Sequence, residues 1–261
     1  MILVFYAFGR ELNALKSRLK TRAPLRAAGL KGFTAQLGGI EMTAVATGIG
    51  PQRATESARR AFESLPRPKL AISTGVAGAL SAGLAAGDLV IAERFVAAHD
   101  GARESRIVRV GAGHLQEAER ALRSAGIKFA TGAIFTSSRV LVSADEKRRA
   151  KSDTGAIAVD MESAMIAAEA LSRDIPFACV RAVLDAVEDE VVGAELADAE
   201  GRVQPARAAS FILRNPALLL KLPRMMRNLS RASRSIADAI EALSRELPSR
   251  AESRLPSPAQ R

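Results

Sequence analysis

The chain has 261 residues, and 48% of them are hydrophobic, which is enough to bury a full core in one large domain. The formal net charge is +10, but residues 201–261 hold 12 Lys and Arg against 4 Asp and Glu, whereas residues 1–200 hold 26 against 24. The basic character therefore belongs to the C-terminal segment. A near-neutral body with few aromatic side chains argues against a protein that stacks on nucleic-acid bases.

Cysteine usage and hydropathy predict a cytoplasmic protein. Cys179 is the only cysteine, and it lies in an apolar run, which is typical of a buried thiol in a reducing compartment. Residues 2–8 are apolar without a basic leader, so they predict a first strand rather than a signal peptide. No apolar stretch approaches the length of a membrane span.

Short apolar runs alternate with helical patterns over the first part of the chain. This alternation predicts an α/β fold with a mostly parallel sheet and helices on both faces. Residues 33–37 and 42–46 flank Gly38-Gly39 as a hairpin, and Gly75 and Gly78 lie in a Gly-rich turn after a strand. Strands are predicted at residues 2–8, 33–37, 42–46, 70–73, 88–96, 127–135, 156–159 and 177–184, and helices at 10–19, 48–65, 114–125 and 144–151.

A further helix is predicted after residue 160. Its apolar residues recur at helical spacing and predict a buried stripe, with Glu162 off that stripe in the first turn. The stripe consists of Met161, Ala164, Met165, Ala168 and Leu171.

The chain changes character after about residue 191. Asn215-Pro216 predicts a helix start, Pro223 interrupts the apolar run, and residues 225–247 continue as a basic amphipathic helix. We therefore divide the chain into a catalytic domain at 1–200, a helical extension at 201–247 and a disordered tail at 248–261. The extension either docks on an anionic bilayer or packs its apolar side on the body, with its arginines outward.

Three acidic residues follow predicted strands, at the edge where open α/β sheets bind their ligands. Asp185 ends an apolar strand, where partial desolvation would raise its pKa, or it is a surface or helix-capping acid. Glu162 and Glu11 could each accept hydrogen bonds from a ligand, or they complement a helix dipole. His99 and His114 lie too far apart and lack cysteine partners, so no metal site is predicted.

Four motifs in order together resemble the nucleoside phosphorylase and nucleosidase family. The resemblance is nearest to the methylthioadenosine/adenosylhomocysteine nucleosidases, and it extends from Met1 to about Asp189. It implies a three-layer α/β/α phosphorylase-like fold with a mixed central sheet, cleavage of the N-glycosidic bond of an adenine nucleoside, no cofactor, and a homo-oligomer. The motifs are Ser73-Thr74-Gly75-Val76-Ala77-Gly78, Gly87-Asp88, Val159-Asp160-Met161-Glu162-Ser163-Ala164 and Arg181-Ala182-Val183-Leu184-Asp185.

The resemblance also implies roles for individual residues. Asp185 matches the general acid that protonates N7 of the purine, and Glu11 matches the acid that activates water in the hydrolytic branch. Met161 and Glu162 match residues that line the ribose, with Glu162 binding its hydroxyl groups. Either water or phosphate could be the attacking group, because the sequence does not separate hydrolysis from phosphorolysis.

Further positions match the walls of the family's substrate site. The chain departs from the family where Leu184 and Val76 replace serines that are common there, so the contacts to substrate differ. The matching positions are Leu141 and Val142, whose backbone groups would contact the base, and Gly75, Val76, Ala77 and Gly78.

The segment from Ala206 to Leu222 resembles the C-terminal extension of hopanoid-associated phosphorylases. That resemblance implies release of adenine from adenosylhopane in hopanoid lipid biosynthesis, with peripheral contact to the inner face of an anionic membrane. A soluble methylthioadenosine/adenosylhomocysteine nucleosidase is the first alternative, and a charge-driven nucleic-acid-binding protein is the second. A nucleoside sensor without turnover is a third.

Overall fold

The computed structural model describes residues 1–27, 29–97, 106–191 and 218–245. His99, the predicted helix start at Asn215-Pro216, the domain boundary at residue 200 and the tail 248–261 lie outside the described residues. The described strands are β1 (Ile2–Tyr6), β2 (Arg22–Pro24), β3 (Lys31–Leu37), β4 (Ile40–Ala46), β5 (Leu70–Ala79), β6 (Leu89–Ala97), β7 (Arg106–Arg109), β8 (Phe129–Thr136), β9 (Ala158–Asp160) and β10 (Phe177–Asp185). The described helices are the 3₁₀ helix η1 (Gly9–Leu12), α1 (Asn13–Arg18), α2 (Pro51–Ser64), α3 (Ala112–Ser124), α4 (Ala144–Thr154), α5 (Ser163–Leu171) and α7 (Leu218–Arg245).

These strands form one mixed sheet, as the family resemblance implies. The mostly parallel sheet predicted from the alternation of strands and helices is wrong, because antiparallel pairs are as common here as parallel ones. Their order is β10-β6-β8-β9-β5-β1-β4-β3-β2, and β7 pairs with β6. β10 also pairs with β5, so the strands from β10 through β5 close into a ring, from which the arm β1-β4-β3-β2 extends. β5 runs parallel to both β1 and β10, whereas β10 runs antiparallel to β6.

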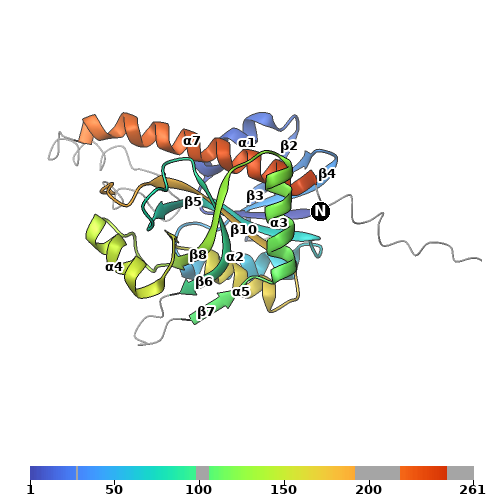
Figure 1. Cartoon of the computed structure of the whole chain (residues 1–261). Helices are drawn as coiled ribbons and strands as arrows, with labels where there is room; N and C mark the ends of the chain where they lie inside the picture. The colour runs from blue at the N-terminus through green and yellow to red at the C-terminus, as the bar shows by residue number, and fades with distance from the viewer. Residues whose placement is uncertain (28, 98–105, 192–217, 246–261) are drawn as a thin grey trace, which may run out of the picture.

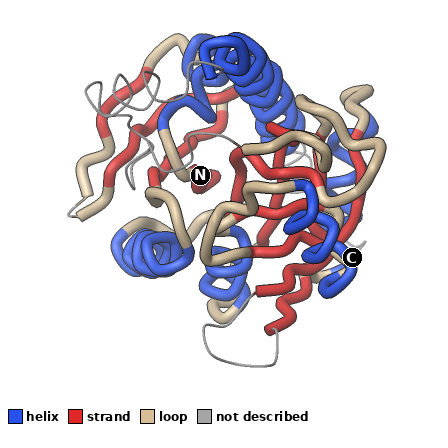
Figure 2. Tube along the Cα trace, turned by 90° about the vertical axis from the view of Figure 1, so that its left-hand side faces the viewer, coloured by secondary structure: helices blue, strands red, loops and turns tan. Residues whose placement is uncertain are grey.

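Helices cover the two faces of this sheet, which gives the three layers (Figures 1 and 2). Alternate residues of β1 face opposite sides, because successive side chains of a strand point to opposite faces. Ile2, Val4 and Tyr6 pack in one cluster with α1, α3 and α7, whereas Leu3 and Phe5 pack in a second cluster with α2 and α5. The predicted three-layer α/β fold is confirmed.

The long helix α7 lies on the sheet side opposite α2 and α5 (Figure 1). Pro223 lies inside this helix and does not end it, which corrects the predicted interruption. From residue 232 onward one side is buried against the body, and this side comprises Ala232, Ser233, Ile236, Ala237, Ala239, Ile240, Ala242, Leu243 and Ser244.

Three other predictions need correction. Gly75 and Gly78 lie within β5 and not in a turn, because β5 continues by pairing with β10 through Gly78. The predicted helix at 10–19 divides into η1 and α1, and the edge strand β2 was not predicted. The buried face of α5 is also different from the predicted stripe, since this helix is apolar almost all round and its sequence pattern does not distinguish one face. Its buried residues are Ser163, Ala164, Ile166, Ala167 and Ala170.

Candidate active site

Glu11 is a buried carboxylate that connects η1 to β5. Its Oε2 accepts hydrogen bonds from the backbone N–H groups of Ala7 at 2.8 Å and Phe8 at 3.0 Å, and its Oε1 accepts one from Val76 at 2.9 Å. Burial raises the pKa of this carboxyl, while Arg181 and the three N–H donors oppose the rise. The carboxylate is therefore held rigidly, and it is more basic than an exposed glutamate.

Arg181, in the middle of β10, supplies the buried positive charge of the site. Its Nη2 lies 2.8 Å from Asp160 Oδ2 and 3.9 Å from Glu162 Oε2. The same guanidinium donates to the backbone carbonyl of Thr74 at 2.7 Å and to Ser163 Oγ at 2.9 Å. A guanidinium presents several donors in a fixed plane, so Arg181 fixes the acids around it relative to β5 and β10.

Glu162 stands immediately before α5, and Met161 separates it from the short strand β9. Its Oε1 accepts a hydrogen bond from the backbone N–H of Gly50 at 2.8 Å, so its carboxylate contacts the start of α2. Burial raises the pKa of Glu162 to about 7, and the neighbouring Asp160 adds to the rise, whereas Arg181 opposes it. At neutral pH this side chain can either accept or donate a hydrogen bond.

The two glycines of β5 mark two positions in the site. At Gly75, with φ +140°, a Cβ would lie 2.3 Å from Arg181 Nη1 and 2.4 Å from Glu11 Oε1, so only glycine fits. At Gly78, a Cβ would lie 3.1 Å from Asp185 Oδ2. Three residue steps along the strand, about 10 Å, separate these glycines.

Asp185 ends β10, where the pairing with β5 shifts register between Val183 and Asp185. Its side chain is 18% exposed, and its Oδ2 lies 2.5 Å from Nζ of the fully buried Lys147 on α4. Burial raises the pKa of Asp185, the Lys147 charge and hydrogen bond lower it, and Asp189 raises it. The carboxylate therefore belongs to the interior, and the reading of a solvated surface acid does not fit its position.

The residues expected to contact the base lie just before α4. Leu141 is buried, whereas Val142 is exposed. The backbone N–H of Val142 donates to Glu146 Oε2 at 2.7 Å, and its carbonyl accepts from the N–H of Val191 at 2.9 Å. The backbone N–H and the carbonyl of Val142 therefore both have hydrogen-bond partners within the chain. A purine that bound to these two groups would have to replace Glu146 and Val191 as their partners.

Glu11 and Glu162 lie around Arg181 near Gly75, and Asp185 lies beside Gly78 on the same strand pair. Sequence reasoning assigned no role to Arg181 or to Lys147. A charged residue inside the apolar strand 177–184 was a signal for Arg181, because a buried guanidinium needs anionic partners. Lys147 had no such signal, since it is one of several charged residues in α4.

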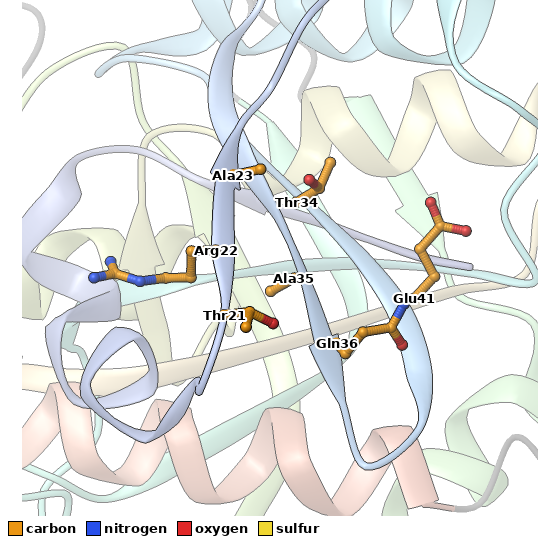
Figure 3. Close-up of a pocket in the computed structure, with 7 residues that line it drawn as sticks. All are labelled: Thr21, Arg22, Ala23, Thr34, Ala35, Gln36 and Glu41. Atoms are coloured by element: carbon orange, nitrogen blue, oxygen red, sulfur yellow. The ribbon is translucent and has the colours of Figure 1, made fainter.

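A separate cavity of about 280 Å³ lies on the outer arm of the sheet, on β2, β3 and β4 (Figure 3). None of its lining residues belongs to the set described above, so it is not part of this candidate site. It is lined by Thr21, Arg22, Ala23, Thr34, Ala35, Gln36 and Glu41.

Comparison with known proteins places this arrangement in a family. The family model described as the phosphorylase superfamily matches residues 1–214. The chain belongs to the phosphorylase superfamily. A 5′-methylthioadenosine/S-adenosylhomocysteine nucleosidase of Listeria monocytogenes is 26% identical over 200 residues, which cover 70% of this chain and 85% of the relative.

Solved structures share the fold of this phosphorylase superfamily member. A 5′-methylthioadenosine/S-adenosylhomocysteine nucleosidase from Neisseria meningitidis, in complex with methylthio-immucillin-A, has a TM-score of 0.71 at 20% identity, covering 93% of this chain and 97% of its own. Futalosine hydrolase of Helicobacter pylori has a TM-score of 0.71 at 16% identity, covering 94% and 97%. The predicted family is confirmed, and so is the prediction that the chain is an enzyme of the nucleosidase and phosphorylase type.

No group of three or more His, Cys, Asp and Glu side chains in the described ranges is placed to hold a metal ion. None of the described helices combines the length and the hydropathy needed to cross a bilayer.

Proposed function

We propose that this phosphorylase superfamily member cleaves the N-glycosidic bond of an adenine nucleoside and releases adenine. The observation that carries the proposal is the placement of three acids along one stretch of β5, two of them buried and the third, Asp185, partly buried. Glu11 and Glu162 meet Arg181 near Gly75, and Asp185 lies beside Gly78. The nucleosidase names of the relatives support adenine nucleosides as the substrate class.

Asp185 is the proposed general acid. Adenine is a poor leaving group until N7 is protonated, so the proton moves from Asp185 to N7 as the bond between C1′ and N9 breaks. The electron pair of that bond passes to the base. Burial raises the pKa of Asp185, which favours the protonated acid closer to neutral pH, although Lys147 opposes this rise.

Glu162 and Glu11 are proposed to act on the sugar side. The ribosyl transition state is cation-like, and anionic groups fixed beside it lower its energy. Glu162 accepts hydrogen bonds from the ribose hydroxyls, with Met161 beside it, and Glu11 takes a proton from water as the water oxygen bonds to C1′. Burial raises the pKa of Glu11 and suits it to this role as a base, so we propose hydrolysis without a cofactor.

We further propose that the nucleoside is adenosylhopane and that the extension serves its lipid part. Support comes from the N-terminal part of α7, which lies at the end of β10: Asn228 Nδ2 donates to the carbonyl of Leu184 at 3.1 Å. In this part Leu222, Met225 and Met226 are exposed, and they offer an apolar surface beside the turn that follows the proposed acid. The resemblance of residues 206–222 to the hopanoid-associated extension supports the same substrate.

A soluble methylthioadenosine or adenosylhomocysteine nucleosidase is the second candidate. The 26% identity with the Listeria relative, over 70% of this chain, favours it. In that case the apolar surface of α7 has no role in substrate binding. The site then holds only the smaller substituents that methylthioadenosine and adenosylhomocysteine carry on C5′.

One experiment tests the proposal and separates the two candidates. Purified full-length protein is incubated with adenosylhopane, methylthioadenosine or adenosylhomocysteine, with and without phosphate, and the products are identified by mass spectrometry. We expect free adenine, fastest release from adenosylhopane, and a free rather than phosphorylated ribosyl product. Asp185→Asn should reduce release by about 10²–10⁴-fold with the circular dichroism spectrum unchanged. Wild-type release by that variant would exclude Asp185 as the acid, and no adenine from any of the three nucleosides would contradict the function.

A further inference from the structure

Lys147 is a fully buried cation whose hydrogen bonds all go to one short segment. Its Nζ donates to Asp185 Oδ2 at 2.5 Å, to the carbonyl of Ala186 at 2.8 Å and to the carbonyl of Asp189 at 2.7 Å. An ammonium group has three N–H donors, so these contacts use its full capacity. One side chain therefore fixes both the proposed acid and the turn behind it.

Other charged groups hold the same turn from outside. Asp189 Oδ2 accepts a hydrogen bond from the backbone N–H of Ala186 at 3.0 Å, and its Oδ1 pairs with Arg224 of α7 at 2.8 Å. Glu188 pairs with Arg148, the residue after Lys147 on α4. The Arg148–Glu188 and Arg224–Asp189 pairs are exposed or partly exposed and each contributes little to stability, whereas Lys147 is buried.

Stability alone is a weak reason for a buried ion pair. Taking two charges out of water costs several kcal/mol, and apolar replacement of such a pair is often neutral or stabilising. A buried pair that includes the proposed catalytic acid instead has a direct use, because a proton donor must be held in one geometry to reach its target atom.

We propose that Lys147 is a positioning residue of the active site, which holds Asp185 by Oδ2 so that Oδ1 is directed at the purine, and which stabilises the carboxylate left after the proton transfer. This inference rests on the proposed function, since it assigns Lys147 a part in the action of Asp185. In the catalytic step Asp185 loses its proton to the base, and the resulting anion lies against the ammonium. No proton leaves Lys147.

Removing the charge of Lys147 should change how activity depends on pH. Among the described residues, the charged groups that act on Asp185 are Lys147 from α4, which lowers its pKa, and Asp189 from the turn, which raises it. Lys147→Met keeps the length of the side chain and leaves burial unopposed, so the pKa of Asp185 rises. The alkaline limb of kcat against pH, where the acid loses its proton, should move to higher pH by about one unit or more.

The loss of orientation should appear separately in the rate. We expect kcat of Lys147→Met to fall by about 100-fold at its own optimum, because a misplaced acid transfers its proton poorly. Lys147→Arg keeps the charge, so its alkaline limb should stay near that of the wild type while kcat falls. Lys151→Met is the matched control, since Lys151 lies one turn further along α4 and, within the described residues, its Nζ donates a hydrogen bond to the carbonyl of Gly155 at 3.4 Å and not to Asp185, so both readouts should match the wild type.

Thermal unfolding against pH provides a readout that does not need turnover. The folded-state pKa of Asp185 is raised, so its contribution to stability is present below the unfolded pKa and is lost as pH rises through the folded value. Without Lys147 the folded-state pKa of Asp185 is higher, so the loss of stability with rising pH is larger. The Tm of Lys147→Met should therefore fall further below that of the wild type as pH increases. In the Asp185→Asn background the same substitution should cause a difference that does not depend on pH. If Lys147→Met alone does not fold, the same measurements are made on Lys147→Arg and on the double variant Lys147→Met with Asp185→Asn.

The outcomes separate this inference from the proposed function. A wild-type protein that releases no adenine contradicts the function and with it the role of Lys147. An active wild type together with a Lys147→Met variant of unchanged kcat and unchanged alkaline limb overturns the role of Lys147 alone. An equal loss of Tm at all pH values, in both the wild-type and the Asp185→Asn backgrounds, also overturns it.

Discussion

Glu162 illustrates how burial and neighbouring charges act together on one side chain. Its carboxylate accepts the N–H of Gly50, lies 3.9 Å from Arg181 and is close to Asp160. Burial is the largest cause of its raised pKa of about 7, so the protein loses free energy when this group ionises near neutral pH. A ligand whose hydroxyl groups donate to the carboxylate would recover part of that free energy.

The pH dependence of stability should report this group. A raised folded pKa means that the contribution of Glu162 to stability is full below its unfolded pKa and is lost as pH rises through about 7. Compared with Glu162→Gln, the wild type should therefore lose about 2 °C of Tm or more between pH 5 and pH 8. Differential scanning calorimetry of both proteins across this range measures the effect, and parallel Tm curves would contradict it.

Gly75 is a position that has no room for a Cβ atom. A Cβ here would clash with Arg181 and Glu11, at a φ of +140° that non-glycine residues rarely adopt. Gly75→Ala should lower the free energy of unfolding by about 3 kcal/mol and should abolish activity, because both charged side chains must move.

Gly113→Ala is the control for this substitution. Gly113 lies in α3, where a Cβ would meet nothing within 4 Å, so alanine should raise stability by about 0.5–1 kcal/mol. Urea unfolding of both variants measures the difference. A Gly75→Ala variant that is as stable as the wild type would contradict the described packing of Glu11 and Arg181.

At the scale of elements, α7 has two parts with different surroundings. Its later part is buried through Ile236, Ile240 and Leu243, in the same cluster as β1. Its earlier part exposes Leu222 and Met225. The packing alternative for the amphipathic helix therefore holds for the later part, and membrane contact remains a proposal for the earlier part.

Vesicle binding tests that proposal. We predict that the full chain binds vesicles of phosphatidylglycerol and phosphatidylcholine, and that binding weakens as the salt concentration rises, because the earlier part combines apolar and basic side chains. Leu222→Glu with Met225→Glu should reduce retention by about tenfold or more without changing Tm, since neither side chain is buried.

Ser230→Glu is the control for each single substitution of this pair, Leu222→Glu or Met225→Glu, because each adds one negative charge. Ser230 is an exposed polar residue of the same helix, so a glutamate there adds negative charge without removing apolar surface. Sedimentation with vesicles compares the variants. Equal retention of the double variant and the wild type would exclude the exposed apolar surface as the membrane contact, and retention on DNA in place of vesicles would favour the charge-driven alternative.

At the scale of the whole molecule, closure of the sheet determines where the site lies. β10 pairs with β5 on one side and with β6 on the other, so both ends of the site are on paired central strands. The carboxylates come from segments far apart in the chain, near residues 11, 162 and 185, and Arg181 and the β5 backbone fix their relative positions. Asp185 belongs to a strand, whereas Glu11 lies in η1 and Glu162 just before α5, so contacts with the strands, and not membership of a strand, fix these two acids.

Much of this arrangement could be predicted from local patterns. The strand that ends in Asp185, the hairpin around Gly38-Gly39 and the buried side of the later part of α7 follow from hydrophobic periodicity, which reports the faces of strongly patterned elements. The extent of β5 and the buried face of α5 could not be predicted in this way. The first depends on a partner strand about a hundred residues away, and the second on a helix whose sides are almost equally apolar.

The sequence by itself determined the family, the alternation of strands and helices, and which acids stand where strands end, because these features are written in local composition and motif order. Only the tertiary structure decided that Lys147 reaches Asp185 and that Arg181 joins Glu162 and Asp160 near Glu11. The physical reason is that a charge in the sequence carries no information about its solvent exposure or its partners. Folding removes water from some of these charges, and those buried groups then require the specific counter-charges and hydrogen bonds found here.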